Sequence, residues 1–255
     1  MDWESLQSIV VHGNTQEFLN QVTESLQTGN KQFGVLQKGL REQCFQQVPI
    51  NAARDFVCQA LLRLISDENT EGKTPIAHLL LEAVPPDNGV PRTSDKAAAH
   101  LFSVCCCAER ARLAVKVAQV FSVKLTDVED QQQCRRCVHS LLQDKALLTP
   151  AVGLLLHFPQ LSDGISVSEV LEGLVEEGQL GLAQRWAATL PLEVQIRLVT
   201  HCVACDRLKE AVKLVRHFHL QQVWRSFIIF RTDCYHPPKG LCNMVAGFEQ
   251  PRCMQ

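Results

Sequence analysis

Two cysteine pairs in this sequence have the spacing that structural zinc sites use. Thiolate and imidazole are common zinc ligands, and a histidine stands close to each pair. The two sets are Cys134, Cys137 and His139, and His201, Cys202 and Cys205. Structural zinc sites usually draw such pairs from turns, whereas both pairs here lie in stretches with helical periodicity, and the gap between them is unusually long. We therefore expect buried helical cysteines and no metal in this chain.

A third set of candidate ligands lies near the end of the sequence, at Cys234, His236, Cys242 and Cys253. Together they have the residue types of a small metal knuckle. Their spacing fits no zinc motif, so we do not expect a metal site here either.

Asp127 and Glu129 have the spacing of the carboxylates that hold divalent ions in metal-dependent exonucleases. In such enzymes the pair lies on a strand. Here it follows Leu125 and Thr126 at a predicted helix start, where acidic side chains interact favourably with the helix dipole. We expect this capping role.

Gly72-Lys73-Thr74 resembles the end of a phosphate-binding loop. That loop needs a glycine where Asp67 stands, and Pro75 removes a backbone donor from the helix that should follow. No nucleotide site is expected.

Five basic residues form the only candidate binding site, a modest phosphate-facing patch. They are Arg110, Arg112, Lys116, Arg135 and Arg136. The alternative is that they only solvate an outer helix face. The net charge of −2 provides no general attraction to nucleic acid or anionic membranes, so any such binding depends on a local patch.

The elements that carry these residues follow a repeated pattern of alanine, an apolar residue three positions on and another seven positions on. Positions with this spacing share one helix face, and a small alanine lets a neighbouring helix approach closely. The pattern recurs about every 30 to 37 residues, which is the length of a two-helix unit. Its copies are Ala77/Leu80/Val84, Ala114/Val117/Phe121, Ala151/Leu154/Phe158, Ala183/Trp186/Leu190 and Ala211/Leu214/Phe218.

The periodicity predicts an all-α fold of stacked helical hairpins, α-solenoid-like, with an irregular C-terminal tail. Two amphipathic helices divided near Gly29-Asn30 are expected in residues 1–47, and Asn51 is expected to cap the next helix. We predict N-terminal helices over 1–84, a helical-repeat region over 94–222 and an irregular tail over 223–255. The later predicted helices are 75–84, 94–107, 111–121, 130–143, 146–158, 166–177, 182–189, 191–205 and 208–218, the last capped by Asp206.

The composition agrees with a helical intracellular protein. Of the 255 residues, 46% are hydrophobic, which is enough for a core, and only 6% are aromatic, which disfavours a β-sandwich or barrel. The first thirteen residues lack the basic and apolar regions of a signal peptide, and no apolar span of about 18 residues occurs. Because the twelve cysteines lie mainly in helix-like runs, we expect a reducing compartment, cytoplasm or nucleus, and not secretion.

Residues 128–220 resemble the amino-terminal helical region of the exonuclease mut-7 homologue family, the 3′–5′ exonuclease domain-containing proteins. The resemblance is carried by VEDQQQCRRCVHSLLQDKALLTPAVGLLLHFPQL and by SEVLEGLVEEGQLGLAQRWAATLPLEVQIRLVTHC. The segment ARLAVKV, residues 111–117, also looks like the start of this region. All three stretches consist of spaced apolar residues and contain no catalytic motif.

The resemblance implies a family of 3′–5′ exonucleases whose downstream DEDD domain hydrolyses terminal phosphodiesters with two divalent metals. After Gln222 this sequence has no strand with a DxE motif and no further acidic motifs, so no catalytic residue is assigned and no cofactor is expected in this chain. The tail has the character of an alternative ending, as in a truncated isoform. The expected function is a non-catalytic interaction module associated with nucleic-acid processing, with a protein partner and no membrane. The alternative is a stand-alone protein-binding helical adaptor.

Overall fold

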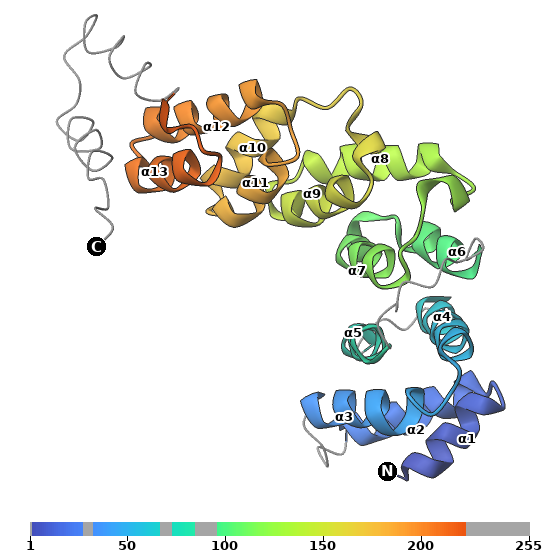
Figure 1. Cartoon of the computed structure of the whole chain (residues 1–255). Coiled ribbons are helices and arrows are strands. Elements are labelled where there is room, and N and C mark those ends of the chain that lie inside the picture. Colours follow the sequence, from blue (N-terminus) through green and yellow to red (C-terminus); the bar gives the residue numbers. More distant parts are fainter. Residues whose placement is uncertain (1, 28–32, 67–72, 85–95, 223–255) are drawn as a thin grey trace, which may run out of the picture. The chain divides into compact units, whose positions relative to one another are not determined.

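The computed structural model describes residues 2–27, 33–66, 73–84 and 96–222, and this part of the chain folds into α-helices joined by short turns (Figure 1). It contains thirteen α-helices, and no strand occurs in these ranges. The prediction of an all-α fold is therefore confirmed. The predicted break at Gly29-Asn30, Gly72 of the Gly72-Lys73-Thr74 motif, the loop at 85–94 and the tail with its four candidate ligands lie outside the described residues.

Contacts group the helices into two compact units. Unit 1 comprises residues 1–143 and 153–161, and unit 2 comprises residues 144–152 and 162 onward. Unit 1 contains α1 (Trp3–Val11), α2 (Thr15–Gln27), α3 (Phe33–Gly39), α4 (Ile50–Ser66), α5 (Lys73–Ala83), α6 (Lys96–Cys105), α7 (Ala111–Phe121) and α8 (Gln131–Leu142). Unit 2 contains α10 (Val167–Glu176), α11 (Leu180–Ala187), α12 (Leu192–Ala204) and α13 (Leu208–His217), while α9 (Leu148–His157) has residues in both units.

The N-terminal part of unit 1 is built around an aromatic core. Phe18 of α2 packs edge-on against Phe56 of α4, with 5.1 Å between ring centroids, and also against Phe45 at 6.1 Å. Phe45 ends a π-helical segment, η1 (Leu40–Phe45), that continues directly from α3. The single helix predicted before residue 29 is wrong, because Gly13 takes a positive φ of 74° and separates α1 from α2.

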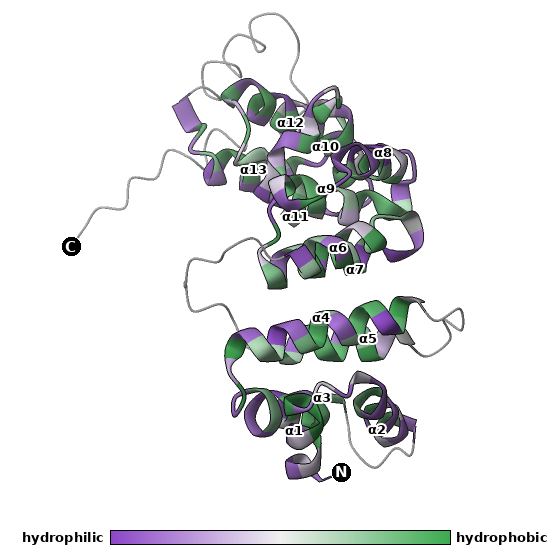
Figure 2. Ribbon diagram, turned by 90° about the vertical axis from the view of Figure 1, so that its right-hand side faces the viewer, coloured by the Kyte–Doolittle hydropathy of each residue, from purple (hydrophilic) through white to green (hydrophobic). Residues whose placement is uncertain are grey.

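Successive helix pairs pack together in unit 1. Helix α4 contacts α5 and α6, and α7 contacts α5 and α6. Figure 1 shows α4 beside α5 and α6 beside α7, and Figure 2 shows hydrophobic and hydrophilic residues alternating along these helices. The prediction that Asn51 caps α4 is wrong, because α4 already begins at Ile50 and Asn51 is an exposed residue of its first turn.

Unit 2 follows the same plan, since α10 contacts α11 and α12, and α12 contacts α13. The predicted cap at Asp206 is also wrong. Arg207 is the N-cap residue of α13, and Asp206 adopts a left-handed conformation that closes α12 instead. Solenoid-like stacking of the whole chain stays a prediction.

The repeated alanine pattern falls on every second helix from α5 to α13. In each of the five copies the alanine and the apolar residue three positions on are buried. The third residue is buried at the end of α7 and just after α5 and α9, whereas Leu190 and Phe218 are half-buried. The pattern thus marks the inward face of alternate helices, as expected for a helical repeat.

Arginine side chains occupy the C-terminal ends of several helices. The last carbonyl groups of a helix have no partner within the helix, and a cation placed there is favoured by the helix dipole. Arg54 donates to the Val120 carbonyl of α7 at 2.8 Å, and Arg110 donates to the Ile65 carbonyl of α4 at 3.3 Å. Arg41 in η1 donates to a carbonyl at the end of α5, and Arg207 donates to two carbonyls at the end of α10.

In the described part of the chain, five helices end in the same backbone motif, with a left-handed residue followed by an amide that bonds back to a carbonyl five residues earlier. Glycine provides the left-handed residue after α1 and α10, at Gly13 and Gly178. Ser122, Asp206 and His219 provide it after α7, α12 and α13, with φ values of 51°, 57° and 57°. The returning bonds are 2.7 to 3.1 Å long.

A search of the described residues found no helix with the length and hydrophobicity needed to cross a membrane.

Candidate functional site

A cavity lies within unit 1, beside α6 and the start of α8. Its volume is about 520 Å³. On one side, Lys96 and His100 lie one turn apart on α6, so both face the same way. Asp127, Glu129 and Asp130 line the cavity from the segment that leads into α8. We call this cavity the acidic pocket.

Carboxylates outnumber cations in the acidic pocket. Asp130 also has a structural task, since its Oδ1 accepts from the Gln133 amide at 2.8 Å and so caps α8. Asp127 accepts from the Thr126 hydroxyl at 3.4 Å. The arrangement can receive a positively charged group between the carboxylates while Lys96 and His100 offer donors from the opposite side. Among the residues that the structure describes, no group of three potential ligands is arranged to hold a metal ion.

The capping role predicted for Asp127 and Glu129 is wrong, because Asp130 is the N-cap residue of α8. Asp127 ends a short 3₁₀ turn, η3 (Leu125–Asp127), and Glu129 follows it in an exposed link. The sequence interpretation missed the pocket because Lys96 and His100 were not connected with these acids. The signal was the polar face of α6, where residues 96, 100 and 103 have helical spacing.

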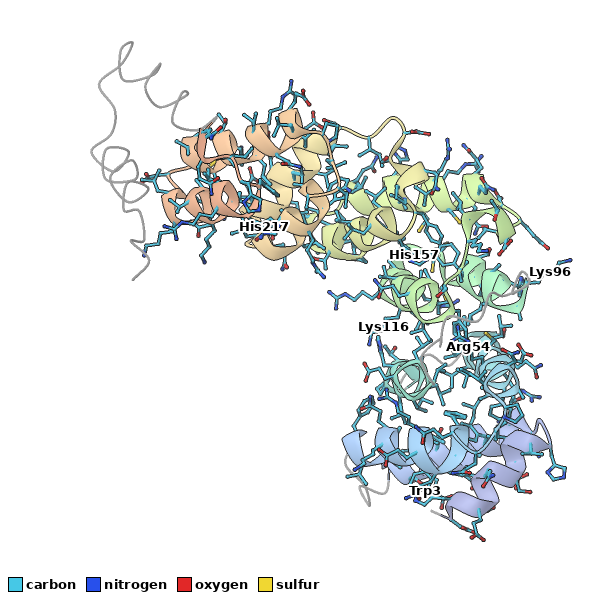
Figure 3. All side chains as sticks on the ribbon, in the orientation of Figure 1. Trp3, Arg54, Lys96, Lys116, His157 and His217 are labelled. Atoms are coloured by element: carbon cyan, nitrogen blue, oxygen red, sulfur yellow. The ribbon has the colours of Figure 1, made fainter. Side chains whose placement is uncertain are left out.

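The five residues of the predicted phosphate-facing patch all belong to unit 1, and none lines the acidic pocket. Arg110 is engaged with the end of α4, and Lys116 pairs with Glu82 of α5 at 2.8 Å (Figure 3). Arg112 of α7 and Arg136 of α8 are exposed, and Arg135 is half-buried. A phosphate-binding role for this set stays a prediction.

Three of the four paired cysteines lie in helices, as expected. Cys134 and Cys137 are buried on α8 and Cys202 is buried on α12, but Cys205 is exposed just after α12, so the prediction of a buried residue is wrong there. Burial raises the pKa of Cys202 to about 11, which keeps it a thiol near neutral pH.

The sequence interpretation did not predict that a third cysteine joins the first pair. The Cys106 Sγ lies 3.7 Å from the Cys134 Sγ, although 28 residues separate them in the chain. The signal available in the sequence was the run Cys105-Cys106-Cys107 at the end of a predicted helix.

Comparisons with protein families, with curated proteins and with solved structures found no match for this chain.

Proposed function

We propose that this chain is a helical-repeat interaction module that binds a protein partner and contributes no catalysis of its own. The inward faces of the repeat helices are used for packing, so binding falls to the outer faces and to the turns between helices. Helical repeats commonly act through such surfaces. The resemblance to the amino-terminal region of a 3′–5′ exonuclease family supports a role beside nucleic-acid processing.

The observation that carries this proposal is the acidic pocket. It is open to solvent, large enough for several side chains, and lined by charged groups from two sides. Because its carboxylates outnumber its cations, a basic side chain of a partner protein is the complementary occupant. Opposite charges across an interface increase the association rate and the specificity of binding.

Site-specific photo-crosslinking in cells tests this proposal. Gln133 lines the acidic pocket, whereas its exposed neighbour Gln132 does not, so a photoreactive residue at each position makes a matched pair. We expect a protein adduct from position 133 only. The purified partner should then bind the chain more weakly after Asp127→Asn with Glu129→Gln. Equal adducts from both positions, or binding that is unaffected by the double substitution, would contradict the proposal.

A second candidate function is direct association with nucleic acid, favoured by the exposure of Arg112 and Arg136. Fluorescence anisotropy with labelled single-stranded RNA at several salt concentrations tests it. Binding should weaken as salt rises. The double substitution Arg112→Ala with Arg136→Ala should reduce the slope of log K against log salt concentration by the equivalent of about two phosphate contacts. Exposed Arg197 of α12 provides the control substitution. Absence of salt-dependent binding would favour the stand-alone adaptor.

We also propose an intracellular location, in the cytoplasm or nucleus. The buried cysteines of unit 1 support it, because thiols persist in reduced form in those compartments. Microscopy of cells that produce the tagged full chain tests the location, and the culture medium is the control fraction for secretion.

A further inference from the structure

Three cysteines of unit 1 converge where the turn after α6 meets α8. Cys106 lies in the turn that follows α6, and Cys134 and Cys137 lie on one face of α8, one turn apart. Their exposed fractions are 5%, 2% and 8%. The Sγ atoms of Cys106 and Cys134 are 3.7 Å apart. The bond length of a disulfide is about 2.05 Å, so the two sulfurs need to approach by about 1.7 Å to become bonded.

The three thiols differ in their acidity because they share hydrogen bonds. The hydrogen bond between Cys106 and Cys134 lowers the pKa of Cys134, and the interaction with Cys106 also lowers the pKa of Cys137. The corresponding interactions raise the pKa of Cys106, together with its burial. The thiols on α8 therefore lose a proton more readily than Cys106 does, and a thiolate is a stronger nucleophile than a thiol.

We propose that Cys106 and Cys134 are an oxidisable pair that forms an intramolecular disulfide when the chain meets hydrogen peroxide. The Cys134 sulfur attacks one peroxide oxygen, the O–O bond breaks, and Cys134 becomes a sulfenic acid as one water leaves. The Cys106 sulfur then attacks the Cys134 sulfur, the S–O bond breaks, and a second water leaves with the Cys106 proton. Two thiols and one peroxide thus give one disulfide and two waters.

The disulfide would tie together the two sides of the acidic pocket. Val104 and Gln133 both line this pocket, and each is within two residues of a cysteine of the pair. Oxidation would therefore fix the turn after α6 to the first half of α8. This inference does not depend on the identity of any binding partner.

Tryptic mapping of the native full chain separates the possible products. Cleavage after Arg135 and Arg136 puts Cys134 in peptide 125–135 and Cys137 in peptide 137–145, while Cys106 is in peptide 97–110. The folded, reduced chain is treated with hydrogen peroxide, alkylated, digested and examined by mass spectrometry without reduction. We expect the main linked product to join peptides 97–110 and 125–135. A main product that joins 125–135 to 137–145 would overturn the proposal, as would an absence of linked product.

Single substitutions assign the atoms of the link. Cys106→Ser should abolish it, whereas Cys107→Ser, the adjacent half-buried control, and Cys137→Ser should retain it. In the Cys106→Ser, Cys137→Ser double variant, dimedone should label Cys134, since no thiol of the cluster remains to react with its sulfenic acid. Loss of the link in Cys107→Ser, or in a Cys137→Ser chain with native circular dichroism, would contradict the assignment. The mapping of the unsubstituted chain stands even if a variant fails to fold.

Discussion

Arg54 is the largest of the fully buried side chains, with only 1% of its surface exposed. Its guanidinium donates to the Val120 carbonyl at the end of α7 and lies 5.1 Å from the centre of the Phe121 ring. A buried cation is costly unless its donors are used, and the helix end and the aromatic face provide partners for it. Figure 3 shows Arg54 between α4 and the helix pair that follows, so this one residue connects successive pairs of unit 1.

Arg54→Ala should lower the free energy of unfolding by about 2 to 4 kcal/mol, because it leaves a cavity and removes a charged donor from a buried carbonyl. Arg54→Lys should have an intermediate effect, since it keeps the charge without the planar group. Exposed Arg112→Ala is the control and should change stability by no more than about 0.5 kcal/mol. Urea denaturation measures all three, and equal effects of Arg54→Ala and Arg112→Ala would contradict the assignment.

His78 gives unit 1 a pH dependence. Burial lowers its pKa below 6.5, Lys116 lowers it further, and Glu82 acts in the opposite direction. Its Nδ1 is buried without a hydrogen-bond partner among the described groups. The unfolded chain therefore binds a proton at a higher pH than the folded chain does, so neutral His78 favours the folded state. Its contribution to the free energy of unfolding is complete above pH 6.5 and is lost as pH falls toward the folded pKa.

The free energy of unfolding should thus decrease on acidification from about pH 7.5 to about pH 5, and His78→Leu should reduce that decrease. Exposed His139→Leu on α8 is the control. Urea denaturation at both pH values gives the comparison. If the free energy of unfolding decreases equally in the His78→Leu variant and the unsubstituted chain, other groups are responsible for the pH dependence.

At this scale the sequence identifies residue types but not their partners. Arg110 and Lys116 look available for phosphate when only local spacing is considered, yet their partners Ile65 and Glu82 are 45 and 34 residues away. The cysteine cluster was not predicted for the same reason, because Cys106 contacts α8 only in the folded chain. Contacts over such separations leave no periodic signal in one sequence.

At the scale of elements, the hydrophobic period was sufficient to locate most helices. The bounds predicted for α7, Ala111–Phe121, are those observed, and the helix predicted over 130–143 is observed as α8 over Gln131–Leu142. Helix ends were harder, because they depend on backbone conformations that several residue types can adopt. Asp206 illustrates this, since an aspartate suits both an N-cap and a left-handed position, and tertiary contacts select the second.

Arg207 links two elements of unit 2, since it begins α13 and donates to the Val175 and Glu176 carbonyls at the end of α10. Arg207→Ala should destabilise unit 2 by about 1 to 2 kcal/mol and speed hydrogen exchange in the last turn of α10. Exposed Lys209→Ala, in the first turn of α13, is the control. Exchange that is equally fast in both variants would argue against a specific role for the guanidinium.

At the scale of the whole molecule, the described residues form two helical units, and the proposed function assigns binding to their outer faces. The resemblance to an exonuclease family concerns the helical region alone. We therefore predict that the purified chain does not trim labelled single-stranded RNA in the presence of Mg²⁺ or Mn²⁺, with a known 3′–5′ exonuclease as the positive control. Metal-dependent trimming that copurifies with the folded chain would overturn the non-catalytic assignment.

The left-handed residues that end α7, α12 and α13 have a consequence for protein engineering. A residue with a side chain is disfavoured in this conformation by about 1 kcal/mol relative to glycine, and Gly13 and Gly178 show that the same turn accepts glycine. Ser122→Gly and His219→Gly should each raise the melting temperature, since both side chains are exposed and neither belongs to the core. A more heat-resistant form of this fold is thus within reach through backbone preference alone, with every packed side chain retained.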